Sequence, residues 1–243
     1  MWTDVVDLRD FYNTTLGAVA QRMIRRAIRQ TWPDVRAMNV LGIGFTTPYL
    51  GPFRPEASRV MAAMPAAQGV LHWPGETDGL TTLVEEFELP FADMSVDRVL
   101  LVHALECTEN VRPMMREVWR VLSGGGRLIV VVPNRRGVWT RFERTPFGRG
   151  RPYSPRQLSQ VLRENMFTPV QTRGALFTPP TASRLALTSA AAIEEIGERW
   201  FNGFSGVVIT EATKQIYAGH TEAKKRARFV RVPQHSPDIS TRG

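Results

Sequence analysis

The sequence of 243 residues has very few of the residues that build disulfide frameworks and metal centres. Its one cysteine, Cys107, excludes an internal disulfide network and a cysteine-rich zinc site. We expect this residue to be small, buried and apolar in character. Its four histidines are scattered without the spacing of metal ligands, so no metal is expected. They are His72, His103, His220 and His235.

Long apolar runs are also absent. The longest, near Val99–Val102 and Leu128–Val132, fall far short of the roughly 20 residues that a membrane-spanning helix needs. The first ten residues carry acids and lack the apolar core of a signal peptide. We therefore expect a cytoplasmic protein without membrane association. A composition of 43% hydrophobic and 22% charged residues excludes collagen, coiled coil and wholesale disorder, and fits one globular domain.

Positive charge is concentrated in two segments, although the whole chain carries a net charge of +8. Residues 134–156 contain seven arginines against Glu143 alone. Residues 221–243 contain six basic residues against Glu222 and Asp238. Such segments attract acidic or phosphate-bearing partners. The alternative for both is a solvated surface without a partner.

Hydrophobic periodicity predicts strands that alternate with helices. Apolar residues at helical spacing indicate a helix over Asp7–Gln30, ended by Trp32-Pro33, and another over Asn110–Leu122, broken by Gly124–Gly126. A capping box at Ser154–Gln157 begins a further helix that runs to about Glu164. Short apolar runs predict five strands: Asn39–Ile43, Arg59–Met64, Thr81–Val84, Arg98–Val102 and Arg127–Val132. This alternation is typical of a doubly wound parallel sheet.

The last third of the chain gives weaker signals. Val170–Phe177 and Val207–Tyr217 are expected to be strands, and Ala182–Phe201 is Ala-rich and helical in pattern. From His220 onward, charge and proline dominate, which predicts a mobile tail.

Four motifs follow one another between Leu89 and Asn134. They are Leu89-Pro90-Phe91, Asp97-Arg98-Val99, His103-Ala104-Leu105-Glu106 and Arg120–Gly125. In this order they resemble the second half of a class I S-adenosylmethionine-dependent methyltransferase of the small-molecule, methyltransferase type 11-like family. The resemblance covers roughly residues 10–217. It implies an α/β fold with a Rossmann-like, doubly wound, mostly parallel seven-stranded sheet that has helices on both faces.

The resemblance also implies a domain organisation and a reaction. We expect an N-terminal helical cap over residues 1–33, a methyltransferase domain over 34–219 and a basic flexible tail over 220–243. The domain would include an arginine-rich loop over 134–156 and a helical segment over 182–204. Its cofactor would be S-adenosyl-L-methionine, with S-adenosyl-L-homocysteine as product and without a metal. The acceptor would be a small or acidic molecule.

The first glycine-rich loop departs from the family pattern. In Val40–Pro48 the usual aspartate is replaced by Gly42, and two glycines are replaced by Thr46 and Pro48. Gly42 and Gly44 remain as points where the backbone can approach a ligand closely, and we expect Gly44→Val to abolish cofactor binding. The resemblance assigns the cofactor to this loop, which also contains Phe45, Thr46 and Thr47. A plain turn is the alternative.

The acid that usually binds the ribose hydroxyls is absent. Met64 or Pro65 stands at that place, and neither accepts those hydrogen bonds well, so Gln68 is the candidate substitute. By resemblance, Glu85 would face the adenine amine. Glu86 and Phe87 would give backbone and apolar contacts to the ring. The alternative for the glutamates is a solvated acidic turn.

Two titratable side chains are candidates for catalysis. His103 follows a central strand and would line the cleft near the methionine moiety; a general base and a structural histidine are its other interpretations. Tyr12 resembles the aromatic residue that closes over the cofactor in relatives, and its alternative is a core tyrosine. Arg135, Trp139 and Phe142 of the arginine-rich loop are candidates for the substrate side, with plain packing as the alternative for the aromatic pair.

Two other functions remain open from the sequence. The altered glycine loop and the missing acid favour a binding module that kept the fold and lost catalysis. An RNA methyltransferase would rest on the arginines alone, and nucleic acid is not favoured because no run of aromatics accompanies them. The apolar residues of Ala182–Phe204 further predict a homodimer contact, unless they simply cover the sheet.

Overall fold

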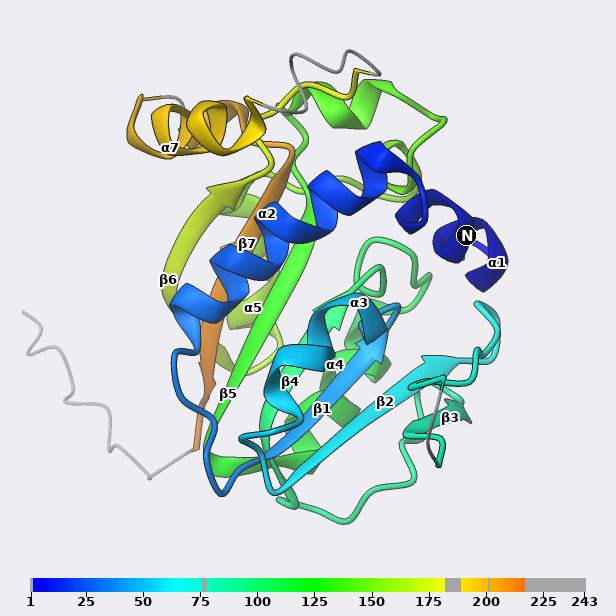
Figure 1. Ribbon diagram of the computed structural model, residues 1–243. Coiled ribbons are helices and arrows are strands. Elements are labelled where there is room, and N and C mark those ends of the chain that lie inside the picture. Colours follow the sequence, from blue (N-terminus) through cyan, green and yellow to red (C-terminus); the bar gives the residue numbers. More distant parts are fainter. Residues whose placement is uncertain (1, 76–77, 182–188, 201, 217–243) are drawn as a thin grey trace, which may run out of the picture.

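The computed structural model describes residues 2–75, 78–181, 189–200 and 202–216, and its centre is a seven-stranded sheet (Figure 1). The strand order is β3-β2-β1-β4-β5-β7-β6. The strands are β1 (Asn39–Gly44), β2 (Arg59–Pro65), β3 (Thr81–Val84), β4 (Val96–Val102), β5 (Leu122–Pro133), β6 (Phe167–Ala175) and β7 (Val207–Lys214). All neighbours from β3 to β5 pair in parallel, whereas β7 is antiparallel to both β5 and β6. The predicted fold class is thus confirmed.

Helices cover both faces of the sheet. The α-helices are α1 (Val5–Tyr12), α2 (Thr15–Thr31), α3 (Thr47–Leu50), α4 (Val111–Val121), α5 (Pro155–Glu164) and α7 (Ala190–Trp200). The described residues also form the short 3-10 helices η1 (Gly51–Phe53), η2 (Val138–Arg141), η3 (Pro146–Gly148) and η4 (Asn202–Phe204). One buried core joins α2 and α3 to one face, and a second joins α4 and α5 to the other. Alternate residues of the central strands point into the two cores, which explains why these strands are apolar throughout.

Two of the predicted helix boundaries are wrong. The single helix expected over Asp7–Gln30 is two helices, because the Thr14 side chain accepts from Gly17 N and begins α2 with a new cap. The glycines 124–126 do not end α4 either. The helix stops at Val121, the buried Leu122 is already extended, and the glycines lie within β5.

Other predictions agree with the structure, differ from it at strand ends, or lie outside its described part. The strand predicted over Val170–Phe177 begins and ends earlier, as β6. The capping box of Ser154 and Gln157 is present at the start of α5. The last strand ends at Lys214, before the predicted Tyr217. Residues 182–188 of the expected helical segment and the tail from 220 onward lie outside the described residues. The homodimer stays a prediction; Ile196, Trp200 and Phe204, which suggested it, are exposed.

The motifs that carry the family resemblance hold the β3–β4 connection against α4. The Arg120 guanidinium donates to the carbonyl oxygens of Leu89 and Phe91, each at 2.8 Å. It also pairs with Glu117 at 2.8 Å, and this contact lowers the pKa of that carboxyl. Glu117 in turn accepts from Leu89 N at 2.9 Å. The Leu-Pro-Phe and Arg-Val-Leu motifs are therefore two halves of one hydrogen-bonded structure.

Within the described ranges, every helix is too short or too polar to cross a lipid bilayer.

Candidate functional site

The parallel strands bring several of the predicted residues together at their carboxyl ends, which is where ligands bind in open α/β sheets. Gly44 ends β1, Gln68 follows β2 and His103 follows β4. We call the region formed by these three residues the strand-end site. Helix α1 lies over this edge of the sheet (Figure 1), and its last residue, Tyr12, completes the group.

Tyr12 is the centre of a buried hydrogen-bonded network. Its hydroxyl lies 2.7 Å from His103 Nε2 and 2.7 Å from the Tyr49 hydroxyl. Its ring stacks on Phe45 with centroids 5.7 Å apart. Burial, followed by the proximity of Tyr49, raises the pKa of Tyr12 well above its ordinary value, so the phenol is neutral at physiological pH. Tyr49 is a site residue that the sequence did not indicate.

Gln68 and the first residues of the chain close the same region. The Gln68 side chain donates to the His103 carbonyl oxygen at 3.0 Å and so spans from β2 to β4. Its backbone carbonyl accepts from Val5 N at 2.8 Å, which fixes the start of α1. Before α1, the Trp2 side chain is hydrogen-bonded to the Glu86 carboxyl. Residues 2–12, which we call the N-terminal segment, therefore cover the ends of β1, β2 and β4.

His103 has an unusual backbone and an acidic neighbour. Its φ of 51° lies in the left-handed region, which is uncommon for residues other than glycine and is concentrated at functional sites. Its Nδ1 lies 3.3 Å from Glu106 Oε1, and both side chains are almost completely buried. On the other side of the ring, Nε2 is hydrogen-bonded to the Tyr12 hydroxyl. Both ring nitrogens are therefore engaged by protein groups.

Three buried polar atoms at this site have no hydrogen-bond partner. They are Thr46 Oγ1, Gln68 Oε1 and Glu106 Oε2. An unpaired buried acceptor costs about 1–3 kcal/mol, so such atoms call for a partner that the protein alone does not supply. They are the donor and acceptor types that an amino acid moiety and a ribose would use.

The space at the strand-end site, in contrast, does not fit S-adenosylmethionine in this arrangement. Tyr12, His103 and Gln68 have exposed fractions of 7%, 2% and 1%, and Gly42 and Gly44 are buried as well. The polar groups of the site therefore suit the cofactor, while the N-terminal segment occupies its volume.

The remaining residues assigned to the cofactor divide into buried and exposed groups. Phe45, Thr46, Met64 and Pro65 are buried, and Thr47 is partly exposed at the start of α3. Glu86 is buried, whereas its neighbours Glu85 and Phe87 are exposed. No contact of Glu85 or Phe87 with the strand-end site is seen among the described residues, so their role toward adenine stays a prediction.

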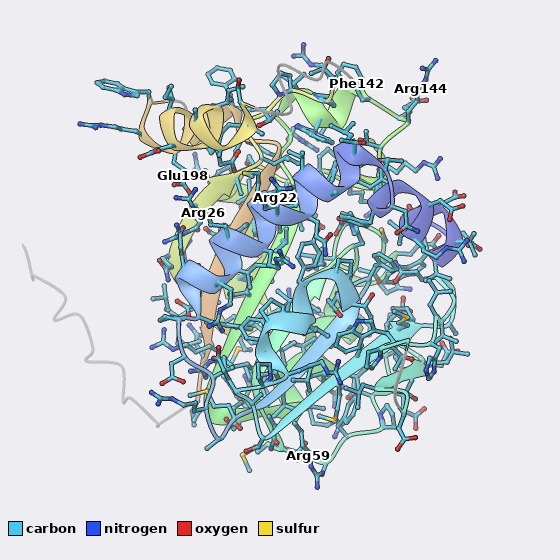
Figure 2. The ribbon with its side chains drawn as sticks, in the orientation of Figure 1. Arg22, Arg26, Arg59, Phe142, Arg144 and Glu198 are labelled. Atoms are coloured by element: carbon cyan, nitrogen blue, oxygen red, sulfur yellow. The ribbon has the colours of Figure 1, made fainter. Side chains whose placement is uncertain are left out.

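The arginine-rich loop folds around aromatic side chains. Trp139 is buried, and its indole Nε1 donates to the Thr178 carbonyl at 2.8 Å, so it packs within the protein. Phe147 was missed in the sequence, yet its ring lies 5.2 Å from that of His103. Arg135 and Phe142 are exposed, and Figure 2 shows Phe142 at the outer surface of the loop.

The buried Glu86 gives a prediction about pH. Burial raises the pKa of its carboxyl above the ordinary value of 4.5. The folded state therefore holds this proton more tightly than the unfolded state, so the free energy of unfolding falls as the pH rises from 4.5 through the raised pKa, and is then constant. Glu86→Gln should remove this decline. Urea unfolding at several pH values tests it, and parallel curves for the two proteins would contradict it.

Comparison with known proteins gives the same family as the motifs. A methyltransferase domain family matches residues 42–130, from β1 into β5. A demethylmenaquinone methyltransferase of Corynebacterium glutamicum is 28% identical over 130 residues, which are 54% of this chain and 56% of that protein. The chain thus spans about half the length of the curated relatives it matches.

Solved structures share the fold along most of the chain. A complex of the Haloferax volcanii Trm112 methyltransferase activator and a methyltransferase matches with a TM-score of 0.64 and 18% identity, covering 89% of this chain and 100% of that one. A Burkholderia thailandensis 1,6-didemethyltoxoflavin-N1-methyltransferase with bound S-adenosylhomocysteine matches with a TM-score of 0.54 and 15% identity, covering 87% and 85%. Motifs, strand order and the match over residues 42–130 agree, and the chain resembles the class I S-adenosylmethionine-dependent methyltransferases in sequence and in fold.

Proposed function

We propose that the protein transfers a methyl group from S-adenosylmethionine to a small acceptor, and that the cofactor enters the strand-end site when the N-terminal segment moves away. The observation that carries this proposal is the set of three unpartnered buried atoms, Thr46 Oγ1, Gln68 Oε1 and Glu106 Oε2. They come from loops after three neighbouring strands, and the family places its cofactor at that edge of the sheet.

The residues of the site have distinct roles in this proposal. Glu106 Oε2 would accept from the ammonium group of the cofactor, and Gln68 Oε1 would accept from a ribose hydroxyl, because both atoms lack a hydrogen-bond partner. The cofactor supplies an electrophilic methyl group on a sulfonium when bound. The protein must then hold the acceptor atom in line with it and exclude water. His103, once released by Tyr12, is the titratable group available to take a proton from the acceptor.

The acceptor is proposed only as a class. The curated relative and the Burkholderia thailandensis structure named above act, by their names, on small organic molecules. Demethylmenaquinone is accordingly the first acceptor to test. The arginine-rich loop supports a small molecule over RNA, because it is tightly folded around Trp139 and Phe147.

Calorimetric titration with S-adenosylhomocysteine tests the proposal. We expect binding with a micromolar dissociation constant, because a missing ribose carboxylate and the cost of moving the N-terminal segment both weaken it. Mass spectrometry of demethylmenaquinone incubated with S-adenosylmethionine and the protein then tests transfer. The absence of heat and of any thermal shift at millimolar cofactor would contradict the proposal and favour a binding module without catalysis.

A further inference from the structure

A second site lies on the other side of Tyr12. The structure has a cavity of about 660 Å³ between the α1–α2 corner, the loop after β1 and the loop after β2. Gly44, Gln68 and His103 do not line it. It is therefore distinct from the strand-end site, although Tyr12 and Phe45 contribute to both.

The charged groups around this cavity have one sign. Arg9 and Arg25 line it together with His72, and no acidic side chain is found among its described lining residues. Arg25 makes no hydrogen bond or ion pair with any described residue. Arg9 is paired with Asp10 at 2.8 Å, but that carboxylate is exposed and does not line the cavity. A cation on a cavity wall without a protein partner favours an anionic ligand.

Aromatic side chains form part of the walls of the cavity. Tyr12 and Phe45 are stacked rings, and Trp73 stands on the opposite loop with Arg54 over its ring. The Gln21 side chain, one helical turn before Arg25, donates to the Pro48 carbonyl at 2.8 Å and joins α2 to the loop after β1. Aromatic walls of this kind favour a planar ligand.

We propose that this cavity, the Arg9–Arg25 pocket, binds a planar aromatic or quinonoid molecule that carries a carboxylate, sulfonate or phosphate. The Arg25 guanidinium would bind the anionic group through bidentate, charge-assisted hydrogen bonds, and the ring of the ligand would lie against the aromatic walls. The proposal does not depend on methyl transfer, because it needs neither the cofactor nor the strand-end site.

The test uses two probes with the same ring, 2-naphthoate and the uncharged 2-naphthalenemethanol, and no cofactor. We expect naphthoate to bind at least tenfold more tightly, and Arg25→Gln to weaken naphthoate about tenfold. Arg22→Gln is the matched control, because this exposed arginine on the same helix (Figure 2) does not line the cavity. Arg9→Gln is a second variant, and we expect it to weaken naphthoate binding as Arg25→Gln does.

Amide and indole NMR shifts locate the probe. Naphthoate should shift the side-chain resonances of Gln21 and Trp73, which line the pocket. Equal affinity for both probes, equal loss in Arg22→Gln and Arg25→Gln, or no binding at millimolar naphthoate would each overturn the proposal. None of these results depends on whether S-adenosylhomocysteine binds.

Discussion

Tyr12→Phe is expected to bind S-adenosylhomocysteine more tightly than the wild-type protein. The substitution removes the hydroxyl that bonds His103 and Tyr49, so it weakens the closed arrangement by about 1–3 kcal/mol. The apparent dissociation constant equals the intrinsic one divided by the open fraction. Because the closed state dominates in the wild-type protein, the apparent affinity of Tyr12→Phe for S-adenosylhomocysteine should be about tenfold higher. Its unfolding temperature should be lower, because the variant loses two buried hydrogen bonds. Calorimetry and thermal unfolding measure the two effects.

Tyr153→Phe is the matched control for this experiment. It makes the same chemical change at a partly buried tyrosine that is not part of the Tyr12 network. We expect its affinity for S-adenosylhomocysteine to equal that of the wild-type protein. Equal or weaker binding by Tyr12→Phe than by wild type would show that the N-terminal segment does not compete with the cofactor.

Gly44→Ala is expected to destabilise the fold by about 3 kcal/mol or more. Gly44 has φ of +87°, and a Cβ there would collide with the Val102 carbonyl oxygen and lie 2.9 Å from the Ala104 Cβ. The sequence suggested that this glycine admits a ligand. The structure gives a different reason for a glycine at this position, since the neighbouring strand β4 and the loop after it take the space that a Cβ would need. Loss of cofactor binding in Gly44→Val would thus report on folding as well as on the site.

Gly51→Ala is the control for the glycine experiment. Gly51 has φ of −47°, and no atom lies within 4 Å of a Cβ placed on it. Its free energy of unfolding should change by less than about 0.5 kcal/mol. Urea unfolding of both variants gives the comparison. A Gly44→Ala protein as stable as Gly51→Ala would show that the loop can relax.

Local patterns explain most of what could be predicted about the fold. The strand Thr81–Val84 and the cap of α5 were predicted to the residue, because alternation and capping are decided by near neighbours in the chain. The break between α1 and α2 was missed. Leu8 and Phe11 fit the helical stripe of α2, and the Thr14 cap separates the two helices.

The candidate site could be predicted only in part. The order of strands brings Gly44, Gln68 and His103 together, and the motifs predicted that edge of the sheet. The resemblance predicted that Tyr12 covers this edge of the sheet, but its hydrogen bond to His103 was not predictable, because that bond joins residues 91 positions apart and depends on how α1 lies on the sheet. Phe147 was missed for the same reason, since its approach to His103 depends on the folding of the arginine-rich loop.

The position of Tyr12 between two sites has a thermodynamic consequence. Its ring forms a wall of the Arg9–Arg25 pocket, while its hydroxyl closes the strand-end site. A pocket ligand that holds this ring in place would stabilise the closed state and lower the affinity for the cofactor. Linkage is reciprocal, so the cofactor would lower the affinity for the pocket ligand by the same factor. One tyrosine would thereby make the two ligands mutual antagonists without any direct contact between them.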